Sequence, residues 1–121
     1  MNNFDVIIPI KAFDWNTAKR TVEYIRKNIV PQNIKIVSSK ALLNNSDFKD
    51  SDVEFLDEDF IYNGLTLQNV KTTMSKFGLD NNSAGWYLQQ FIKLSYSRLC
   101  KDDYYLVWDS DTVPVRKINF F

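Results

Sequence analysis

Two aspartates stand one residue apart, directly after an apolar segment, near the end of this 121-residue sequence. In "YYLVWDSDTVPV", residues 104–115, Asp109 and Asp111 follow five aromatic or aliphatic residues. Side chains at i and i+2 of an extended chain point to the same side, so both carboxylates can face one ligand. They would lie roughly 6.6 Å apart along a strand, so a turn, expected at residues 112–114, or a bridging water must bring them to one ion. Paired carboxylates suit a hard cation such as Mg²⁺ or Mn²⁺.

Three interpretations of this D-x-D triplet have to be compared. Two acids after a strand often form no more than a solvated turn or a helix cap. In haloacid-dehalogenase-like phosphatases, an apolar strand followed by D-x-D carries an aspartate nucleophile and an aspartate acid/base, here Asp109 and Asp111. In nucleotide-sugar glycosyltransferases the pair holds the metal that neutralises a leaving diphosphate. The phosphatase motif lies on the first strand of its domain, whereas several elements precede the motif here, so its position favours the glycosyltransferase.

The composition restricts the other functions that can be considered. Lys plus Arg and Asp plus Glu both number 15, so no global field draws the chain to nucleic acid or to an anionic membrane. Histidine is absent and Cys100 is the only cysteine, which excludes a Cys/His zinc site, a histidine-based triad and a disulfide framework. The first residues lack the pattern of a signal peptide or a membrane span. We therefore expect a cytoplasmic protein, with a peripheral position at the inner membrane face as the alternative.

Apolar runs and helical periodicities alternate along the chain, and we treat residues 1–121 as one domain. Asp14 is expected to cap the first helix and Gly78 to end the second. The inner face of the third helix is expected to carry Leu88, Phe91, Ile92, Ser95 and Leu99. This order predicts an α/β fold with a mainly parallel sheet and helices on both faces, and ligands beyond the carboxyl ends of the strands. The expected strands are 5–10, 33–39, 53–56, 104–108 and the start of a fifth at 118–121, and the expected helices are about 15–28, 66–77 and 86–99.

A family resemblance rests on "GWYLQQFIKLSYSRLCKDDYYLVWDSDTVPV", residues 85–115, and on the shorter "DVIIPIK" and "FLDED". These stretches resemble a GT-A-like family of bacterial proteins, domain of unknown function 6492, which is itself similar to glycosyltransferases. The resemblance implies a Rossmann-like GT-A nucleotide-diphospho-sugar transferase fold. It also implies metal-dependent transfer from a nucleoside-diphosphate sugar, with a UDP-sugar as the first choice, to a glycan or surface polysaccharide acceptor.

The resemblance implies a role for each aspartate. Asp111 would be the direct ligand of Mn²⁺ or Mg²⁺, and Asp109 would bind the metal through water or hold the ribose. A base-and-ribose pocket would be built by the first strands. Ser38 and Ser39 end the second expected strand, and the acidic stretch "DEDF", residues 57–60, follows the third. Either group could contact the base, and either could be a solvated loop.

Five further residues would bind the nucleotide sugar. Trp86, Gln90 and Lys93 recur at i, i+4 and i+7 and share one helix face. Lys93 would reach the phosphates or the sugar while the other two line the sugar pocket, and the alternative is a partly buried packing face. Lys11, just past the first strand, would meet a phosphate or line the nucleotide pocket, unless it is a solvated loop lysine. Ser110 lies between the two metal ligands.

The chain departs from the family pattern in its length. A GT-A fold is considerably longer, and its second half supplies the acceptor site, the catalytic base of an inverting enzyme and often a histidine ligand. We therefore expect a donor-binding half without turnover of its own, whether as a trimmed fragment, a truncated reading frame or a half-domain completed by another chain. Phe120 and Phe121 would leave an unfinished sheet edge that favours self-association. The alternative function is a nucleotide-binding or interaction module.

Overall fold

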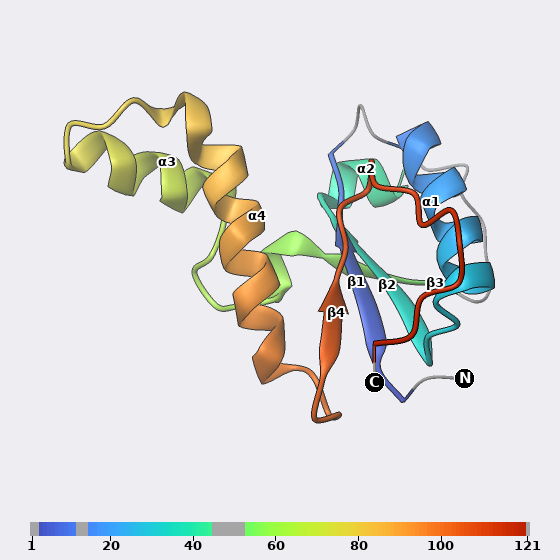
Figure 1. Ribbon diagram of the computed structural model, residues 1–121. Coiled ribbons are helices and arrows are strands. Elements are labelled where there is room, and N and C mark those ends of the chain that lie inside the picture. Colours follow the sequence, from blue (N-terminus) through green and yellow to red (C-terminus); the bar gives the residue numbers. More distant parts are fainter. Residues whose placement is uncertain (1–2, 12–14, 45–52, 121) are drawn as a thin grey trace.

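The computed structural model describes residues 3–11, 15–44 and 53–120. These residues form an α/β structure whose four strands are all parallel and lie in the order β3-β2-β1-β4 (Figure 1). This confirms the predicted parallel sheet and is consistent with a Rossmann-like fold. The first four predicted strands are present with small differences in length, and β4 is the shortest. The strands are β1 (Asp5–Pro9), β2 (Asn33–Ser38), β3 (Val53–Asp57) and β4 (Tyr105–Val107).

The helices begin and end close to the predicted residues. The second predicted helix starts after Thr66, whose hydroxyl accepts a hydrogen bond from the Asn69 amide at 3.1 Å. It ends before Gly78, whose φ of 72° is a conformation that glycine adopts without strain. The predicted cap Asp14 lies outside the described residues, and the short helix α2 was not predicted. The helices are α1 (Trp15–Asn28), α2 (Lys40–Asn44), α3 (Leu67–Lys76) and α4 (Ala84–Ser95), with short 3-10 turns η2 (Glu58–Phe60), η3 (Asn81–Ser83) and η4 (Tyr96–Arg98).

The sheet is covered on both faces, as predicted. Alternate residues of the central strand β1 point to opposite faces, so Ile8 packs against α1 and Ile7 packs against α4. All five residues of β1 are buried, which explains why the strand is apolar from Val6 to Pro9. Figure 1 shows α1 and α4 on opposite sides of the sheet and α3 beyond α4. On its sheet-facing side α1 carries Ala18, Val22, Ile25 and Ile29.

The inner face of α4 differs from the prediction. Leu88 and Ile92 are buried against the sheet, as expected, and Tyr96 follows them in η4. Phe91 and Leu99 are 45% and 46% exposed, so their predicted inward positions are wrong. The helix is approached by α3 from a second side, and Phe91 lines an apolar cavity there instead of the sheet. Ser95, also predicted to face inward, is only half-buried.

The predicted fifth strand is absent from the described residues 118–120. Instead, the amide of Ile118 donates a hydrogen bond to the carbonyl oxygen of Asn28 at 3.0 Å, an acceptor that the end of α1 leaves free. The Phe120 ring lies edge-on to the Phe4 ring, with centroids 6.0 Å apart. The segment after β4 therefore runs back across α1 toward the starts of the strands (Figure 1, red). Self-association through the sheet edge stays a prediction.

Within residues 3–11, 15–44 and 53–120, no helix has the length and apolar character needed to cross a bilayer.

Candidate functional site

The carboxyl ends of all four strands lie at one edge of the sheet because the strands are parallel. The register pairs Pro9 with Val37 and Ile7 with Val107. The Trp108 amide continues this ladder by donating to the Ile7 carbonyl oxygen at 2.9 Å, so the next residue, Asp109, lies just beyond the sheet. The predicted position of the D-x-D triplet, at the edge where ligands bind in such sheets, is confirmed.

The triplet itself forms a tight turn, which we call the DSD turn (Asp109–Thr112). The Thr112 amide donates to the Asp109 carbonyl oxygen at 3.1 Å, so Ser110 and Asp111 occupy the two central positions. The Trp108 indole Nε1 donates to the Thr112 carbonyl oxygen at 2.5 Å, and this second hydrogen bond to Thr112 also closes the turn. The turn was predicted at residues 112–114, after the acids, and this placement is wrong. Asp109 and Asp111 are both exposed, whereas Ser110 is buried.

The DSD turn and α4 enclose a polar cavity of about 210 Å³, which we call the aspartate cavity. Six of the seven predicted site residues line it, and the predicted spacing of i, i+4 and i+7 along α4 does place three of them together there. Pro9 and Gln89 also line the cavity and were missed, because nothing in a single proline or glutamine indicates a site. The lining residues are Pro9, Trp86, Gln89, Gln90, Lys93, Asp109, Ser110 and Asp111.

A close ion pair crosses the aspartate cavity. The Lys93 ammonium lies 2.8 Å from the Asp109 carboxylate, and the lysine side chain is only 17% exposed. The Tyr105 hydroxyl donates to the Lys93 carbonyl oxygen at 2.6 Å, which ties this part of α4 to β4. The cavity therefore holds two carboxylates and one ammonium, a charge set that can attract a cation and an anion together.

The fit of these residues to Mn²⁺ or Mg²⁺ depends on what completes the metal's coordination. In the part of the chain that the structure describes, no three or more His, Cys, Asp or Glu side chains are grouped so that they could hold a metal ion. Mg²⁺, however, is commonly bound by one or two carboxylates together with waters and substrate phosphates. Asp109 and Asp111 fit that second kind of site, in which part of the coordination comes from the ligand.

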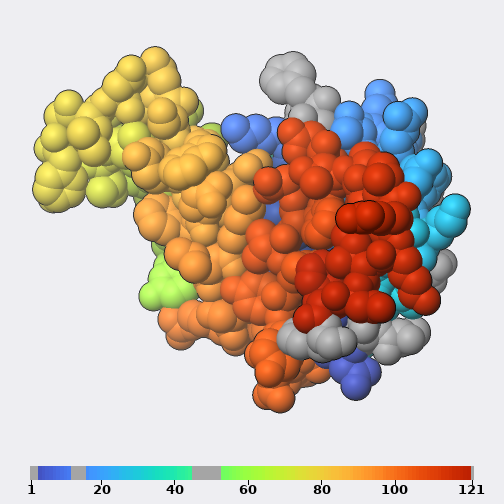
Figure 2. All heavy atoms as spheres, in the orientation of Figure 1, coloured from blue at the N-terminus to red at the C-terminus, as the bar shows by residue number. Residues whose placement is uncertain are grey.

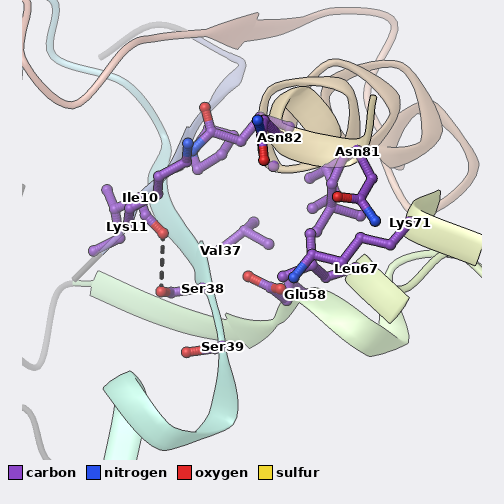
Figure 3. Close-up of a pocket in the computed structure, with 15 residues that line it drawn as sticks. Ile10, Lys11, Val37, Ser38, Ser39, Glu58, Leu67, Lys71, Asn81 and Asn82 are labelled. Carbon is purple, nitrogen blue, oxygen red and sulfur yellow. Dashed lines mark hydrogen bonds between the residues drawn. The ribbon is translucent and has the colours of Figure 1, made fainter. Parts of the chain in front are cut away.

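A larger cavity of about 380 Å³ lies next to the first, at the ends of β1, β2 and β3, and we call it the strand-end cavity. Lys11, the seventh predicted residue, lines this cavity and not the aspartate cavity. Pro9 and Gln89 line both cavities, so the two are neighbours. In Figure 3 Glu58 and Lys71 enter the strand-end cavity from the α3 side and Ser38 lies at the end of its strand. Its polar and charged lining residues are Lys11, Ser38, Ser39, Glu58, Lys71, Asn81, Asn82 and Gln89.

Two local contacts shape the strand-end cavity. The Ser38 hydroxyl donates to the Ile10 carbonyl oxygen at 3.0 Å, which joins the ends of β1 and β2 (Figure 3). The Lys11 side chain lies against the first turn of α4, where a Cβ added to Gly85 would be 3.3 Å from Nζ. Asn81 and Asn82 enter from the loop before α4, which the sequence marks only as polar. No periodic pattern in the sequence predicts that this loop and Lys71 on α3 line the same cavity.

The pKa of Glu58 leads to a testable prediction on stability. Burial raises it, and the neighbouring Asp59 and Asp57 raise it further. The folded chain therefore holds the Glu58 proton more tightly than the unfolded chain, so stability is lost as pH rises from the ordinary glutamate pKa through the raised one. Glu58→Gln removes this loss. We expect a higher melting temperature for the variant at about pH 7 and almost no change at about pH 3.5.

Differential scanning fluorimetry at both pH values measures this difference. Glu23→Gln on the exposed side of α1 is the matched control. An equal shift in the melting temperature of Glu58→Gln at both pH values would contradict a raised pKa of Glu58 in the folded chain. Binding sites often contain a buried carboxylate whose charge lowers the stability of the fold.

Comparisons with known proteins identify a family. The model of the family of unknown function DUF6492 matches residues 2–120, nearly the whole chain. Comparisons with curated proteins and with solved structures gave no match. The match includes both cavities and the DSD turn, and it confirms the family resemblance given by residues 85–115. The chain therefore belongs to the DUF6492 family.

Proposed function

We propose that this chain binds a nucleoside-diphosphate sugar together with Mn²⁺ or Mg²⁺ and is the donor-binding part of a GT-A-type glycosyltransferase. The observation that carries the proposal is the DSD turn at the carboxyl edge of a parallel sheet. It places Asp109 and Asp111 beside Lys93 in a polar cavity, and a larger cavity adjoins it. The strand-end cavity also has apolar lining residues such as Val37 and Leu67, whereas the aspartate cavity is mainly polar, so the two match a ligand with a heterocyclic base and a charged diphosphate sugar.

In this proposal the aspartate cavity holds the metal, the diphosphate and the sugar. Asp109 and Asp111 would supply carboxylate oxygens to the metal, and phosphate oxygens and waters would complete its coordination. The bound metal would supply Lewis-acid stabilisation of the departing diphosphate. Lys93 would move from the Asp109 carboxylate toward a phosphate oxygen once the metal neutralises that carboxylate. Trp86 is 56% exposed and offers its ring to the sugar.

The strand-end cavity would hold the nucleoside. Ser39 and Asn82 offer hydrogen-bonding groups to the base and ribose, and Glu58 adds a carboxyl group. Lys11, against the first turn of α4, would lie on the path from the nucleoside to the diphosphate. A glycan or surface polysaccharide is the proposed acceptor.

Isothermal titration calorimetry of uridine diphosphate into the chain, with and without Mn²⁺, tests the proposal. Saturable binding that requires the metal supports it, and GDP and CDP titrations in the same buffer then rank the bases. No binding of any of the three nucleotides with Mn²⁺ would overturn the proposal. Hydrolysis of a phosphate monoester that depends on Asp109 would instead favour the phosphatase.

Because Lys93 pairs with Asp109, we expect Lys93→Gln to have opposite effects on the affinity for Mn²⁺ alone and on the affinity for uridine diphosphate with Mn²⁺. The pair is 2.8 Å long and its carboxylate is 62% exposed. Exposed pairs of this kind are worth about 0.2–1 kcal/mol, so freeing Asp109 should tighten binding of Mn²⁺ alone by up to about fivefold. Binding of uridine diphosphate with Mn²⁺ should weaken at least about threefold, because the phosphates lose a cation.

The measurement is calorimetry with each ligand, and Lys76→Gln at the end of α3 is the matched control. Lys76 is exposed and does not line either cavity. If Lys93→Gln weakened both affinities equally, or changed neither, Lys93 would not exchange between the carboxylate and a phosphate.

A further inference from the structure

Helix α1 carries two buried polar residues beside its apolar stripe. Thr21 is fully buried, and Asn28 is 7% exposed. They are seven residues apart, about two helical turns, and therefore lie on the same side of the helix. Buried polar side chains are usually hydrogen-bonded, so the partners of these two residues indicate what their positions are for.

Both residues donate to the backbone of the segment that follows β4. The Thr21 hydroxyl lies 2.6 Å from the carbonyl oxygen of Ser110, and the Asn28 side-chain nitrogen lies 2.6 Å from the carbonyl oxygen of Pro114. Ser110 and Pro114 are themselves buried. Both bonds span more than 80 residues of sequence. In Figure 2 this segment (orange-red to red) covers much of the face in view, with α1 (blue) at its edge.

We infer that Thr21 and Asn28 are positioning residues for the two aspartates of the DSD turn. The inference rests on the proposed function, because it assigns the turn to a metal and a diphosphate. Thr21 holds the peptide group between Ser110 and Asp111, and so sets the direction in which the Asp111 carboxylate leaves the backbone. Asn28 holds the same segment four residues further along.

The opposite side of the turn is contacted by α4, where the Lys93 ammonium pairs with the Asp109 carboxylate. Thr21 contacts the turn from α1, on the other face of the sheet from α4. The two carboxylates are thus oriented from both sides, as a site needs when its ligands must be placed to within a few tenths of an ångström.

A purely local role for Thr21 has to be separated from this one. Its hydroxyl also lies 3.1 Å from the Thr17 carbonyl oxygen, a contact that helical threonines often make within their own helix. The hydroxyl has one proton, and the Ser110 oxygen is the nearer acceptor. A local role predicts that loss of the hydroxyl changes the stability of α1 but leaves the affinity of the DSD turn for its ligand unchanged.

Thr21→Val is the test, because valine keeps the shape and removes the donor. Calorimetry with Mn²⁺ and uridine diphosphate measures affinity, and amide hydrogen exchange of Thr112, relative to the amides of β1, measures the order of the turn. We expect about a tenfold loss of affinity and about tenfold faster exchange at Thr112. Thr21→Ser, which keeps the hydroxyl, should stay within about threefold of wild type in both. Should Thr21→Val fail to fold, Thr21→Ala is measured instead, with the same direction of change.

Val22→Ala is the matched control, because Val22 is fully buried in the same helix but faces the sheet. It should lower the melting temperature while leaving affinity and the relative exchange of Thr112 unchanged. Wild-type affinity in Thr21→Val, or an equal loss in Val22→Ala, would overturn the positioning role. If the wild-type chain binds no nucleotide with Mn²⁺, the proposed function fails and the positioning role fails with it. Faster exchange at Thr112 in Thr21→Val would then show that Thr21 orders the turn without a role in ligand binding.

Discussion

Asp111→Asn is expected to weaken the Mn²⁺-dependent binding of uridine diphosphate at least about tenfold, and by up to about a hundredfold. Asparagine matches the shape of aspartate and can occupy the same central position of the DSD turn. It lacks the negative charge that a hard cation requires from its ligand, so the metal and the diphosphate are lost together. Calorimetry of the wild-type and variant chains, at the same Mn²⁺ concentration, measures the change.

Asp103→Asn is the matched control for this prediction. Asp103 is an exposed acid in the loop before β4 and lines neither cavity. Its removal changes the net charge by the same amount, so any general electrostatic effect appears in both variants. An equal loss in the two variants, or an unchanged affinity in Asp111→Asn, would show that Asp111 does not hold the metal.

The largest effect on stability is expected from Ile25→Ala. Ile25 is fully buried between α1 and the sheet, in the cluster that also contains Ile8 and Ile36. Truncation of a buried isoleucine removes apolar contacts and leaves a cavity, and typically lowers the free energy of unfolding by about 2–5 kcal/mol. Because a domain of this size is stable by about 5–15 kcal/mol, that loss is a large fraction of the total.

Urea denaturation followed by far-UV circular dichroism measures this change. Glu23→Ala, two residues away on the exposed side of α1, should stay within about 0.5 kcal/mol of wild type. A loss below about 1 kcal/mol for Ile25→Ala would mean that α1 does not pack on the sheet as the structure has it.

The elements that bury a continuous or periodic apolar surface were predictable from the sequence. β1 is buried along its whole length, and the stripe on α1 repeats at helical spacing, so each could be recognised from its own residues. The position of Asp109 followed from the order of these elements, because parallel strands end at one edge. The sharing of one cavity by Trp86, Gln90 and Lys93 followed from their spacing on one helix.

The features that depend on contacts between distant segments were not predictable. Phe91 was placed toward the sheet because the sequence gives no sign that α3 approaches α4 from the side. Residues 118–120 are apolar enough for a strand, but their backbone bonds to the end of α1 instead. Thr21 is a single threonine within a helix, and only its bond to the Ser110 carbonyl oxygen distinguishes it from other threonines.

The strand-end cavity also contains some residues that could be predicted from the sequence and others that could not. Lys11 was predicted, because it follows a strand, to meet a phosphate or to line the nucleotide pocket, and it lines the strand-end cavity and not the aspartate cavity. Lys71 and Asn82 come from two further elements, and only the packing of α3 and α4 brings them to the ends of β1 and β2. If the proposed function is right, the base of the donor is contacted by Ser39 and Glu58, which the sequence offered as base contacts, and by Asn82, which it did not indicate.

The most direct test of the central claim is the position of bound Mn²⁺. In nitrogen–proton correlation NMR spectra of the labelled chain with uridine diphosphate, small additions of paramagnetic Mn²⁺ broaden the signals of nearby amides. If Mn²⁺ binds at the DSD turn, the amides of this turn lose intensity first, together with the Trp86 indole signal, and Asp111→Asn prevents the loss. Broadening centred on the acidic residues 57–59, or spread evenly over the chain, would contradict binding at the DSD turn.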